Sequence, residues 1–468
     1  MNIEDPKTLK PGEARSEGTS VQEYLDTEVR PVPETLRRNT YVYNGSEDLD
    51  TSRWTTREFH DMEMQHVWSK VWQMVCREEE IPETGDHIVY DIGDYSFIIV
   101  RTSENEVKGY YNSCLHRGTQ LRPSDSEGNV PQFRCPYHGW TWNLEGELID
   151  LPCDWDFPHV DKAKATLPEV QVDFWGGFVF INMDDDAESL ADYLGNLPAE
   201  FESWNYEKKY KQHHIAKRVD MNWKVGVEAF IESYHVIATH PQIMPSTADA
   251  NTQYDVDPQQ NVNRMITAMA VPSPHLDPIE EQEIVDAMLG RANRLGMDPT
   301  AFDVPEGSTA RQFLAEMRRQ TVGPELGQDY TTYTDSEMLD AIQYWVFPNF
   351  FPWGGVGTNI VYRFRPDGNN PDSAFMEVII LSDYDQSQPR PEPAEMRVLG
   401  EDEPWSKAED QFGGLAGVFE QDMGNMPRVQ RGMKASKKGV TLGNYQESRV
   451  RHLHTKIDEY IRKGVESA

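Results

Sequence analysis

The chain has 468 residues, of which 38% are hydrophobic and 11% aromatic, and its formal net charge is −35 at pH 7. This length allows two or three domains, and the acidic charge disfavours nucleic acid and anionic membrane surfaces as partners. No run approaches the roughly 18 apolar residues of a membrane-spanning helix, and the polar first segment lacks the apolar core of a signal peptide, so we expect a cytoplasmic protein.

Changes in residue pattern divide the chain into three parts. We expect an irregular N-terminal arm at residues 1–54, followed by a helix whose capping pair is Thr55 and Glu58. Short β-branched runs and turns such as Glu145-Gly146 then predict a small all-β domain, which with the leading helix covers residues 55–184. Residues 185–468 mix helical stretches with strands. The predicted fold class is α+β, with a small β domain before a larger α+β domain.

Two short motifs in the predicted β domain each carry one cysteine and one histidine. "CLHRG" contains Cys114 and His116, and "CPYHGW" contains Cys135 and His138. A structural zinc site is the alternative, but zinc fingers usually group the two cysteines together and the two histidines together. A Rieske [2Fe–2S] cluster has two thiolates on one iron and two imidazoles on the other. The split pattern therefore favours a Rieske cluster.

A glycine follows each motif closely. Gly118 and Gly139 lack a Cβ atom, so the backbone could approach the cluster at these positions. We expect their N–H groups to donate hydrogen bonds to the cluster sulfurs.

A second group of metal-ligand residues lies in "FIESYHVIATHP". His235 and His240 are five residues apart, which displaces them by about 140° on a helix. We expect a helix over residues 222–238 that ends near Ala238, with His240 beyond its end because Pro241 disfavours helix there; a bulge in the helix is an alternative. Two histidines and a carboxylate typically hold mononuclear non-haem Fe(II), but the pair alone also fits two unrelated histidines.

Together these segments resemble the large (α) subunit of Rieske non-haem iron aromatic-ring-hydroxylating oxygenases, over about residues 55–465. The resemblance rests on "CLHRG", "CPYHGWTW", "NWKVGVEAFIESYHVIATHP", "FPN" at 347–349 with "VYRFRPDG" after it, and "FEQDMGNMPRVQRGM". It implies a catalytic domain with a helix-grip (START-like) fold around a substrate cavity. It also implies that Asp422, eight residues before Gln430, is the third iron ligand, with Glu420 as the alternative.

The resemblance assigns a further role to an acidic residue three positions before the first histidine ligand, which is Glu232 here. It implies that Glu232 bridges the Rieske cluster of one subunit and the iron of its neighbour in a homotrimer; the alternative is a surface glutamate. Many relatives have an asparagine at the position of Glu228 or Ala229. Glu228, one helical turn before Glu232, could line the site or pair with a cation.

The implied function is that of a terminal oxygenase that uses O2 to mono- or cis-dihydroxylate a hydrophobic, aromatic or polycyclic substrate. Electrons would come from NAD(P)H through a separate reductase, often with a ferredoxin, because the chain has no glycine-rich dinucleotide fingerprint. A small β subunit could accompany the trimer. The alternatives are a monooxygenase that removes methyl or other alkyl groups, a Rieske electron-transfer protein without catalysis, and a zinc-stabilised binding protein.

Residues 240–345 are expected to shape the substrate pocket. Its large apolar residues could line the pocket or belong to the ordinary core. They are Met244, Met265, Met269, Met288 and Phe313. Its arginines, Arg264, Arg291 and Arg294, could form a salt bridge with a substrate carboxylate or lie in solvent.

Overall fold

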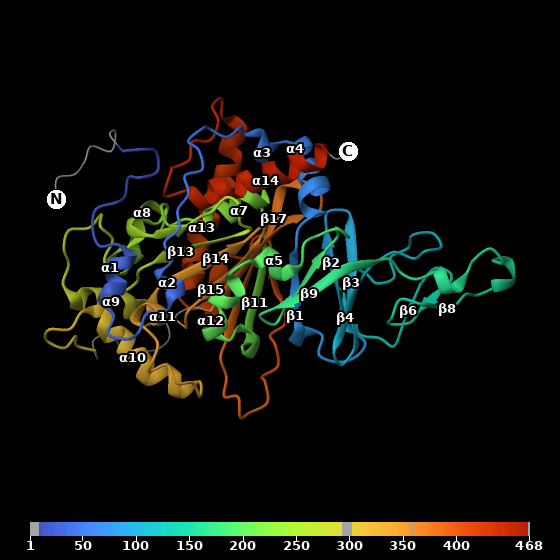
Figure 1. Cartoon of the computed structure of the whole chain (residues 1–468), viewed down its shortest axis with the longest axis horizontal. Coiled ribbons are helices and arrows are strands. Elements are labelled where there is room, and N and C mark those ends of the chain that lie inside the picture. Colours follow the sequence, from blue (N-terminus) through green and yellow to red (C-terminus); the bar gives the residue numbers. More distant parts are fainter. Residues whose placement is uncertain (1–8, 125, 293–301, 357–358, 467–468) are drawn as a thin grey trace.

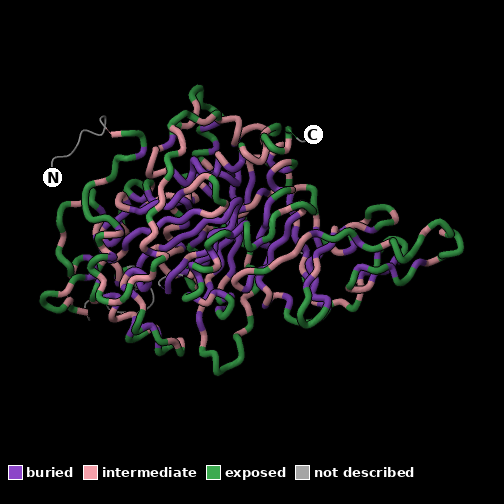
Figure 2. The backbone as a smooth tube through the Cα atoms, in the orientation of Figure 1, coloured by how far each residue is buried: buried purple, intermediate pink, exposed green. Residues whose placement is uncertain are grey.

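The computed structural model describes residues 9–124, 126–292, 302–356 and 359–466, with only the backbone described at 291 and 292. A body built on a large sheet forms one part of the molecule, and a smaller β lobe projects from one end of its long axis (Figure 1). Buried residues fill the centre of the body, whereas the outermost loops of the lobe are exposed (Figure 2). This arrangement agrees with the predicted α+β class.

The small domain contains a seven-stranded sheet in the order β1-β10-β9-β4-β3-β2-β5 and a three-stranded sheet in the order β6-β7-β8. The strands of the larger sheet are β1 (Gln73–Arg77), β2 (Asp86–Ile92), β3 (Tyr95–Ser103), β4 (Glu106–Tyr111), β5 (Glu127–Asn129), β9 (Glu169–Trp175) and β10 (Phe178–Asn182). Those of the smaller sheet are β6 (Phe133–Arg134), β7 (Thr141–Trp142) and β8 (Leu148–Asp150).

The predicted turn at Glu145-Gly146 joins β7 to β8. Gly146 has a φ of +80°, and its N–H donates to the carbonyl of Asn143 over 3.1 Å. Glycine adopts this left-handed conformation without steric cost, which explains why the hairpin turns here. The lobe has its own apolar cluster, which includes Phe133 and Trp142.

The leading helix differs from the expectation by one residue at its start. Two short helices, α3 (Ser52–Thr55) and α4 (Arg57–Glu63), precede a π-helical turn at Met64–Trp68. Thr56 is extended and its side chain accepts from the Phe59 N–H, so Thr56 caps α4. The predicted cap, Thr55, lies in the last turn of α3, where its hydroxyl donates to the Thr51 carbonyl.

The body is built on an eight-stranded sheet in the order β12-β13-β14-β15-β16-β17-β11-β18. Its strands are β11 (Tyr210–Val219), β12 (Gln253–Asp255), β13 (Val262–Thr267), β14 (Ala341–Val346), β15 (Phe350–Gly354), β16 (Ile360–Asp367), β17 (Asn370–Ser382) and β18 (Arg397–Leu399). Neighbouring strands are antiparallel except β11 and β18. The large sheet thus provides one continuous surface for the helices that carry the site.

Helices of the second half cover this sheet. Helix α7 packs on β16 and β17, and α13 packs on α7. Besides α3 and α4, the α-helices of the described chain are α1 (Val21–Asp26), α2 (Glu34–Arg37), α5 (Leu190–Leu194), α6 (Leu197–Glu200), α7 (Trp223–Ala229), α8 (Val236–Thr239), α9 (Glu281–Ala292), α10 (Ala310–Glu325), α11 (Asp335–Leu339), α12 (Glu409–Phe412), α13 (Leu415–Ala435) and α14 (Ser448–Glu466). In the described part of the chain, no helix has the length and apolar character needed to cross a bilayer.

The arm before α3 is attached to the body. The N–H of Val42 donates to the carbonyl of Val256, and that of Leu49 donates to the carbonyl of Val440. These bonds hold the described part of the arm along the surface of the larger domain.

The expected helix over residues 222–238 is wrong, because the chain breaks between α7 and α8. In the break, the Ser233 N–H donates to the Tyr254 hydroxyl over 3.0 Å, and the Ile231 carbonyl accepts from Arg449 over 3.4 Å. These tertiary hydrogen bonds satisfy backbone groups that a continuous helix would pair internally. Beyond the break, Glu232, Ser233 and His235 line a cavity in the body.

Candidate functional site

His235, His240 and Asp422 meet at one point. His235 precedes the first residue of α8 and His240 follows its last, while Asp422 lies in α13. Asp422 Oδ1 lies 2.9 Å from His240 Nε2 and 3.7 Å from His235 Nε2. One ligand atom from each residue lies within 4.8 Å of the other two. The four-residue helix between the histidines resolves the five-residue spacing, because both flank α8 and neither lies inside a long helix.

Each histidine is oriented by a second residue. Glu232 binds His235 through both Nδ1, at 2.5 Å, and the backbone N–H, at 3.0 Å. The side-chain oxygen of Gln421 lies 2.8 Å from His240 Nδ1. An acceptor at Nδ1 leaves each Nε2 free to bind a metal, as in most protein metal sites. The donor set therefore fits a mononuclear Fe(II).

The electrostatics of this group favour a cation. Burial alone lowers the pKa of His235, but the Glu232 carboxylate and then Asp422 outweigh it and raise the pKa to about 9. Two carboxylates therefore face His235. A metal ion at Nε2 would compensate the same negative charge that a proton compensates on the free imidazole.

An apolar cavity of about 230 Å³ opens beside the three residues. Its wall is formed largely by side chains of the helices and of β13 to β16. The apolar part of its lining includes Phe230, Val236, Ile243, Met265, Met269, Leu339, Trp353, Ile360, Tyr362, Leu415 and Phe419. The described acidic and histidine side chains at the cavity are Glu232, His235, His240 and Asp422. The cavity thus brings an apolar ligand to the candidate iron site.

The apolar residues and arginines proposed for the pocket divide into two groups. Met265 and Met269 line the cavity, whereas Met244, Met288 and Phe313 do not. Arg264 is buried and paired with Asp255 and Glu200, so it is not available to a substrate. Arg294 and the side chain of Arg291 lie outside the described residues.

Glu228 turns away from the metal group toward α14. Its Oε1 atom accepts a hydrogen bond from the indole N–H of Trp54, at 2.7 Å, and lies 2.9 Å from His454 Nε2. Burial raises its pKa to about 8 despite the Trp54 bond. Glu228 still reaches a second cavity of about 190 Å³, which Glu232 and Glu447 also line on the α13 and α14 side of the site.

Glu420 does not join the metal group. Its carboxylate accepts from the Trp405 N–H over 2.6 Å, at the side of α13 that faces Trp405. Asp422 is buried beside His240 instead. Of the two acidic residues considered for the third ligand, the structure brings only Asp422 to the histidines.

The other candidate ligands gather on two loops of the projecting lobe. Cys114 and Cys135 are buried, and burial, followed by the neighbouring Cys135 thiol, raises the pKa of the Cys114 thiol. His116 Nδ1 and His138 Nδ1 lie 3.1 Å apart, and the His138 side chain is exposed. Two sulfurs on the inside and two imidazoles on the outside fit the two different irons of a Rieske cluster.

The loop glycines act differently from the expectation. Gly118 and Gly139 have φ values of +77° and +80°, but their N–H groups donate to the carbonyls of Cys114 and Cys135. The N–H groups that reach the sulfurs belong to His116 and Arg117 in the first loop, and to Tyr137 and His138 in the second. The glycines therefore close the turns, and their neighbours contact the sulfurs.

The two groups of ligands lie far apart within the chain. The loops accompany β6 and β8 in the projecting lobe, whereas α8 lies at the other side of the body (Figure 1). Glu232 contacts His235 and is not in contact with the described residues of the lobe loops. Within this chain, the two groups of ligands are therefore not in contact.

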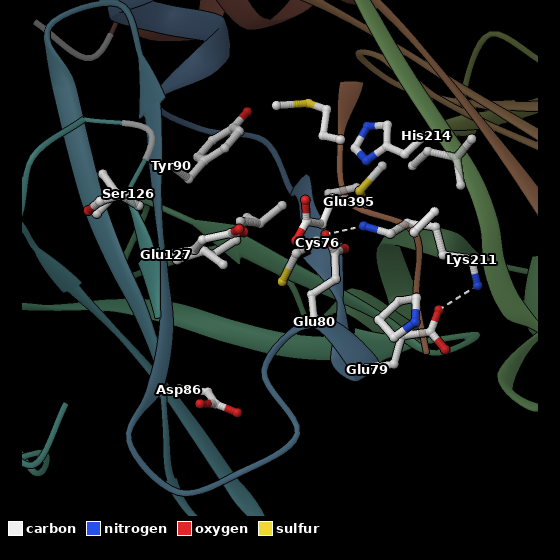
Figure 3. A pocket seen from close by; sticks show the side chains of 18 of the residues that line it. Cys76, Glu79, Glu80, Asp86, Tyr90, Ser126, Glu127, Lys211, His214 and Glu395 are labelled. Atoms are coloured by element: carbon white, nitrogen blue, oxygen red, sulfur yellow. Dashed lines mark hydrogen bonds and ion pairs between the residues drawn. The ribbon is translucent and has the colours of Figure 1, made fainter. Parts of the chain in front are cut away.

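A larger cavity, of about 380 Å³, lies between the small domain and the large sheet (Figure 3). Lys211 and His214 enter it from β11, opposite Tyr90 and Glu127. Its cations are paired, since Lys211 binds Glu80 and the guanidinium groups of Arg363 and Arg365 bind Glu377. None of the candidate metal ligands lines it, so we assign it to the seam between the domains.

Several residues at the site were not indicated by the sequence patterns. Gln421 orients His240, Gln343 and Trp353 line the cavity, and Arg449 lies directly behind Gln343. Gln421 is adjacent to Asp422, which is a weak signal for a supporting role. The other three come from strands and a helix with no local motif.

Two known protein families match this chain over separate segments. The family described as the ring hydroxylating alpha subunit (catalytic domain) matches residues 199–463. The Rieske [2Fe-2S] domain family matches residues 71–161.

Relatives of known activity include both mono- and dioxygenases. The glycine betaine monooxygenase oxygenase subunit of Pseudomonas aeruginosa is 30% identical over 186 residues, which cover 39% of this chain and 42% of that protein. The anthranilate 1,2-dioxygenase large subunit of Acinetobacter baylyi is 30% identical over 212 residues, 44% of each chain. The chain thus spans less than half the length of these relatives.

Solved structures share the fold over a greater length. A quaternary ammonium Rieske monooxygenase in complex with L-carnitine has a TM-score of 0.61 at 17% identity, covering 88% of this chain and 95% of that one. Naphthalene 1,2-dioxygenase from Rhodococcus bound to indole has a TM-score of 0.58 at 22% identity, covering 88% and 94%. At these identities the similarity establishes a common fold.

Proposed function

This chain belongs to the family of ring-hydroxylating alpha subunits, and we propose that it is a terminal oxygenase that hydroxylates a hydrophobic substrate with O2 and electrons from NAD(P)H. One observation carries the proposal. His235, His240 and Asp422 converge at the wall of an apolar cavity, with both Nε2 atoms directed to the same carboxylate.

Each residue at this wall has a distinct task. His235, His240 and Asp422 hold the mononuclear Fe(II), which supplies reductive O2 activation when bound. Glu232 and Gln421 fix the two imidazole rings through their Nδ1 atoms. The apolar side chains of the cavity bind the substrate body and exclude water.

Cys114, His116, Cys135 and His138 hold the [2Fe–2S] cluster in the projecting lobe, which supplies electrons when bound. This assignment is supported by the convergence of two thiols and two imidazoles on neighbouring loops. It divides the chain into an arm (1–54), a Rieske domain (55–184) and a catalytic domain (185–468).

The separation of the two sites supports a functional homotrimer, with or without a small β subunit. In this assembly, Glu232 lies between His235 of its own chain and the cluster loops of a neighbouring copy. Electrons reach the cluster from a separate NAD(P)H reductase, directly or through a ferredoxin, in the cytoplasm. Mono- and dihydroxylation, and removal of an alkyl group, are all compatible with this site.

Replacement of His235 tests the proposal. The purified wild-type protein should hold about three irons per chain, two in the cluster and one in the mononuclear site. His235→Ala should lose one iron and all hydroxylation, measured with a cognate reductase, NADH and O2, yet keep the Rieske EPR signal. His275→Ala is a matched control, because His275 is exposed and belongs neither to the metal group nor to the lining of its cavity.

Other outcomes identify the alternatives. A wild-type protein with two irons per chain and no hydroxylation is an electron carrier. If the purified protein is colourless and contains zinc, the assignment of both iron sites is wrong. Hydroxylation that survives His235→Ala contradicts the assignment of the three ligands.

A further inference from the structure

Arg449 is a buried arginine without a carboxylate partner among the described residues. Its side chain is fully buried, and it donates to Asn263 Oδ1 and, over 2.8 Å, to Gln343 Oε1. One of its terminal nitrogens has no hydrogen-bond partner in the described structure. An uncompensated buried charge is costly, and burial lowers the pKa of Arg449 to about 9.

Arg449 determines which way the Gln343 amide points. A guanidinium has donors and no acceptor, so the oxygen of Gln343 must face Arg449 and the NH2 group must point away from it. Gln343 lies on β14 and lines the cavity beside the iron ligands. No acceptor for this NH2 group is present among the described residues.

Trp353 places a second donor beside the first. Gln343 on β14 and Trp353 on β15 are directly paired across the two antiparallel strands, and both line the cavity. The indole Nε1–H of Trp353 is buried and has no acceptor among the described residues. An indole can only donate, and directly paired residues have Cβ atoms about 5 Å apart.

We propose that the Gln343 amide and the Trp353 indole form a donor pair that anchors an oxygen acceptor of the substrate, and that the substrate is an apolar ring compound carrying a carbonyl or carboxylate group. This inference rests on the proposed function and defines its substrate class. The positive charge of Arg449 behind Gln343 favours an acceptor at this point. A ligand without one leaves two buried donors unpaired, which penalises its binding.

Two molecules of nearly equal shape test the pair. Acetophenone and ethylbenzene differ mainly in the carbonyl oxygen, and their binding to the iron-loaded protein is measured by calorimetry without reductant. The wild type should bind acetophenone about five- to tenfold more tightly. Gln343→Leu and Trp353→Phe should each lower this ratio toward one, while iron content and circular dichroism stay at the wild-type level.

Thr267→Val is the matched control. It removes a hydroxyl from the same cavity that is already hydrogen-bonded to Ser233 and Thr252, so the preference should remain. Equal affinities in the wild type, including no binding of either compound, overturn the inference, and so does a preference that survives in both variants. Benzoate as a third ligand distinguishes the two acceptors, since tighter binding than acetophenone identifies a carboxylate and weaker binding a neutral carbonyl.

This experiment is separable from the test of the proposed function. Preferential binding of acetophenone without hydroxylation of any bound ligand would contradict the oxygenase and leave the donor pair standing. Hydroxylation of both compounds with equal affinities would contradict the donor pair and leave the oxygenase standing.

Discussion

The two candidate metal sites are built in contrasting ways. The cluster site uses two short loops, in which each cysteine and its histidine lie within three residues of each other, and its His138 is exposed. The iron site joins α8 to a distant aspartate in α13, and its His240 and Asp422 are buried. A site on exposed loops can meet a partner, whereas a buried site can exclude water from a substrate.

Loss of a cluster ligand should separate the two sites most strongly. Cys114→Ser should remove the red-brown colour and about two of the three irons per chain, because a serine hydroxyl is a poor substitute for a thiolate. Iron analysis and the visible spectrum measure the effect. Cys153→Ser is the control, since Cys153 is an exposed free cysteine outside the cluster loops. Retention of the spectrum in Cys114→Ser would remove Cys114 from the ligand set.

The reciprocal change is at Asp422. Asp422→Ala should lose about one iron per chain and hydroxylation, because two imidazoles alone do not neutralise the metal charge. The spectrum of the cluster should be unchanged, which would show that the sites load independently. Glu420→Ala should retain the iron, since Glu420 binds the Trp405 N–H instead. Loss of iron in Glu420→Ala together with retention in Asp422→Ala would identify Glu420 as the ligand.

A smaller effect is expected at the residue that orients His235. Glu232→Gln should keep iron at both sites yet lower turnover about 10- to 100-fold, because the neutral amide holds the imidazole less well. Glu228→Gln is the matched control, since Glu228 faces Trp54 and His454 rather than His235. Steady-state and single-turnover product formation are compared in both. Unchanged rates in Glu232→Gln would exclude a functional role.

The smallest expected effect concerns the pH dependence of the stability of the body. Burial lowers the pKa of His452, in the body, to about 3. The unfolded chain binds this proton below about pH 6.5, so stability is complete above that pH and falls as the pH decreases toward 3. At pH 5.5 the loss should be about 1.4 kcal/mol.

The hydrogen bonds of His452 explain why it stays neutral. Arg449 holds the Asn263 oxygen, so the Asn263 NH2 group donates to His452 Nδ1. Denaturant unfolding of the wild type and His452→Gln at pH 7.5 and 5.5 checks this prediction. The variant should lose less stability on acidification, and equal losses would contradict a buried neutral histidine.

Elements that depend on contacts close in sequence were predicted correctly, whereas those that depend on distant contacts were not. The hairpin at Gly146 and the cluster loops depend on contacts within a few residues, and both were identified from short motifs. The break in the expected helix over 222–238 was not identified, because its backbone groups bond to Tyr254 and Arg449, which lie far away in the sequence. The capping position failed by one residue, because Thr55 completes a preceding short helix that the pattern did not reveal.

The sequence by itself determined the class of the protein and its candidate ligands. Residue type and local spacing carry that information, since thiolates, imidazoles and a nearby proline act over a few bonds. Only the tertiary structure decided between Glu420 and Asp422 as the neighbour of the histidines and paired Glu228 with His454. It alone also placed Gln343 and Trp353 side by side. Those outcomes depend on strand register and on which face of a helix is buried, and both are set by packing between distant segments.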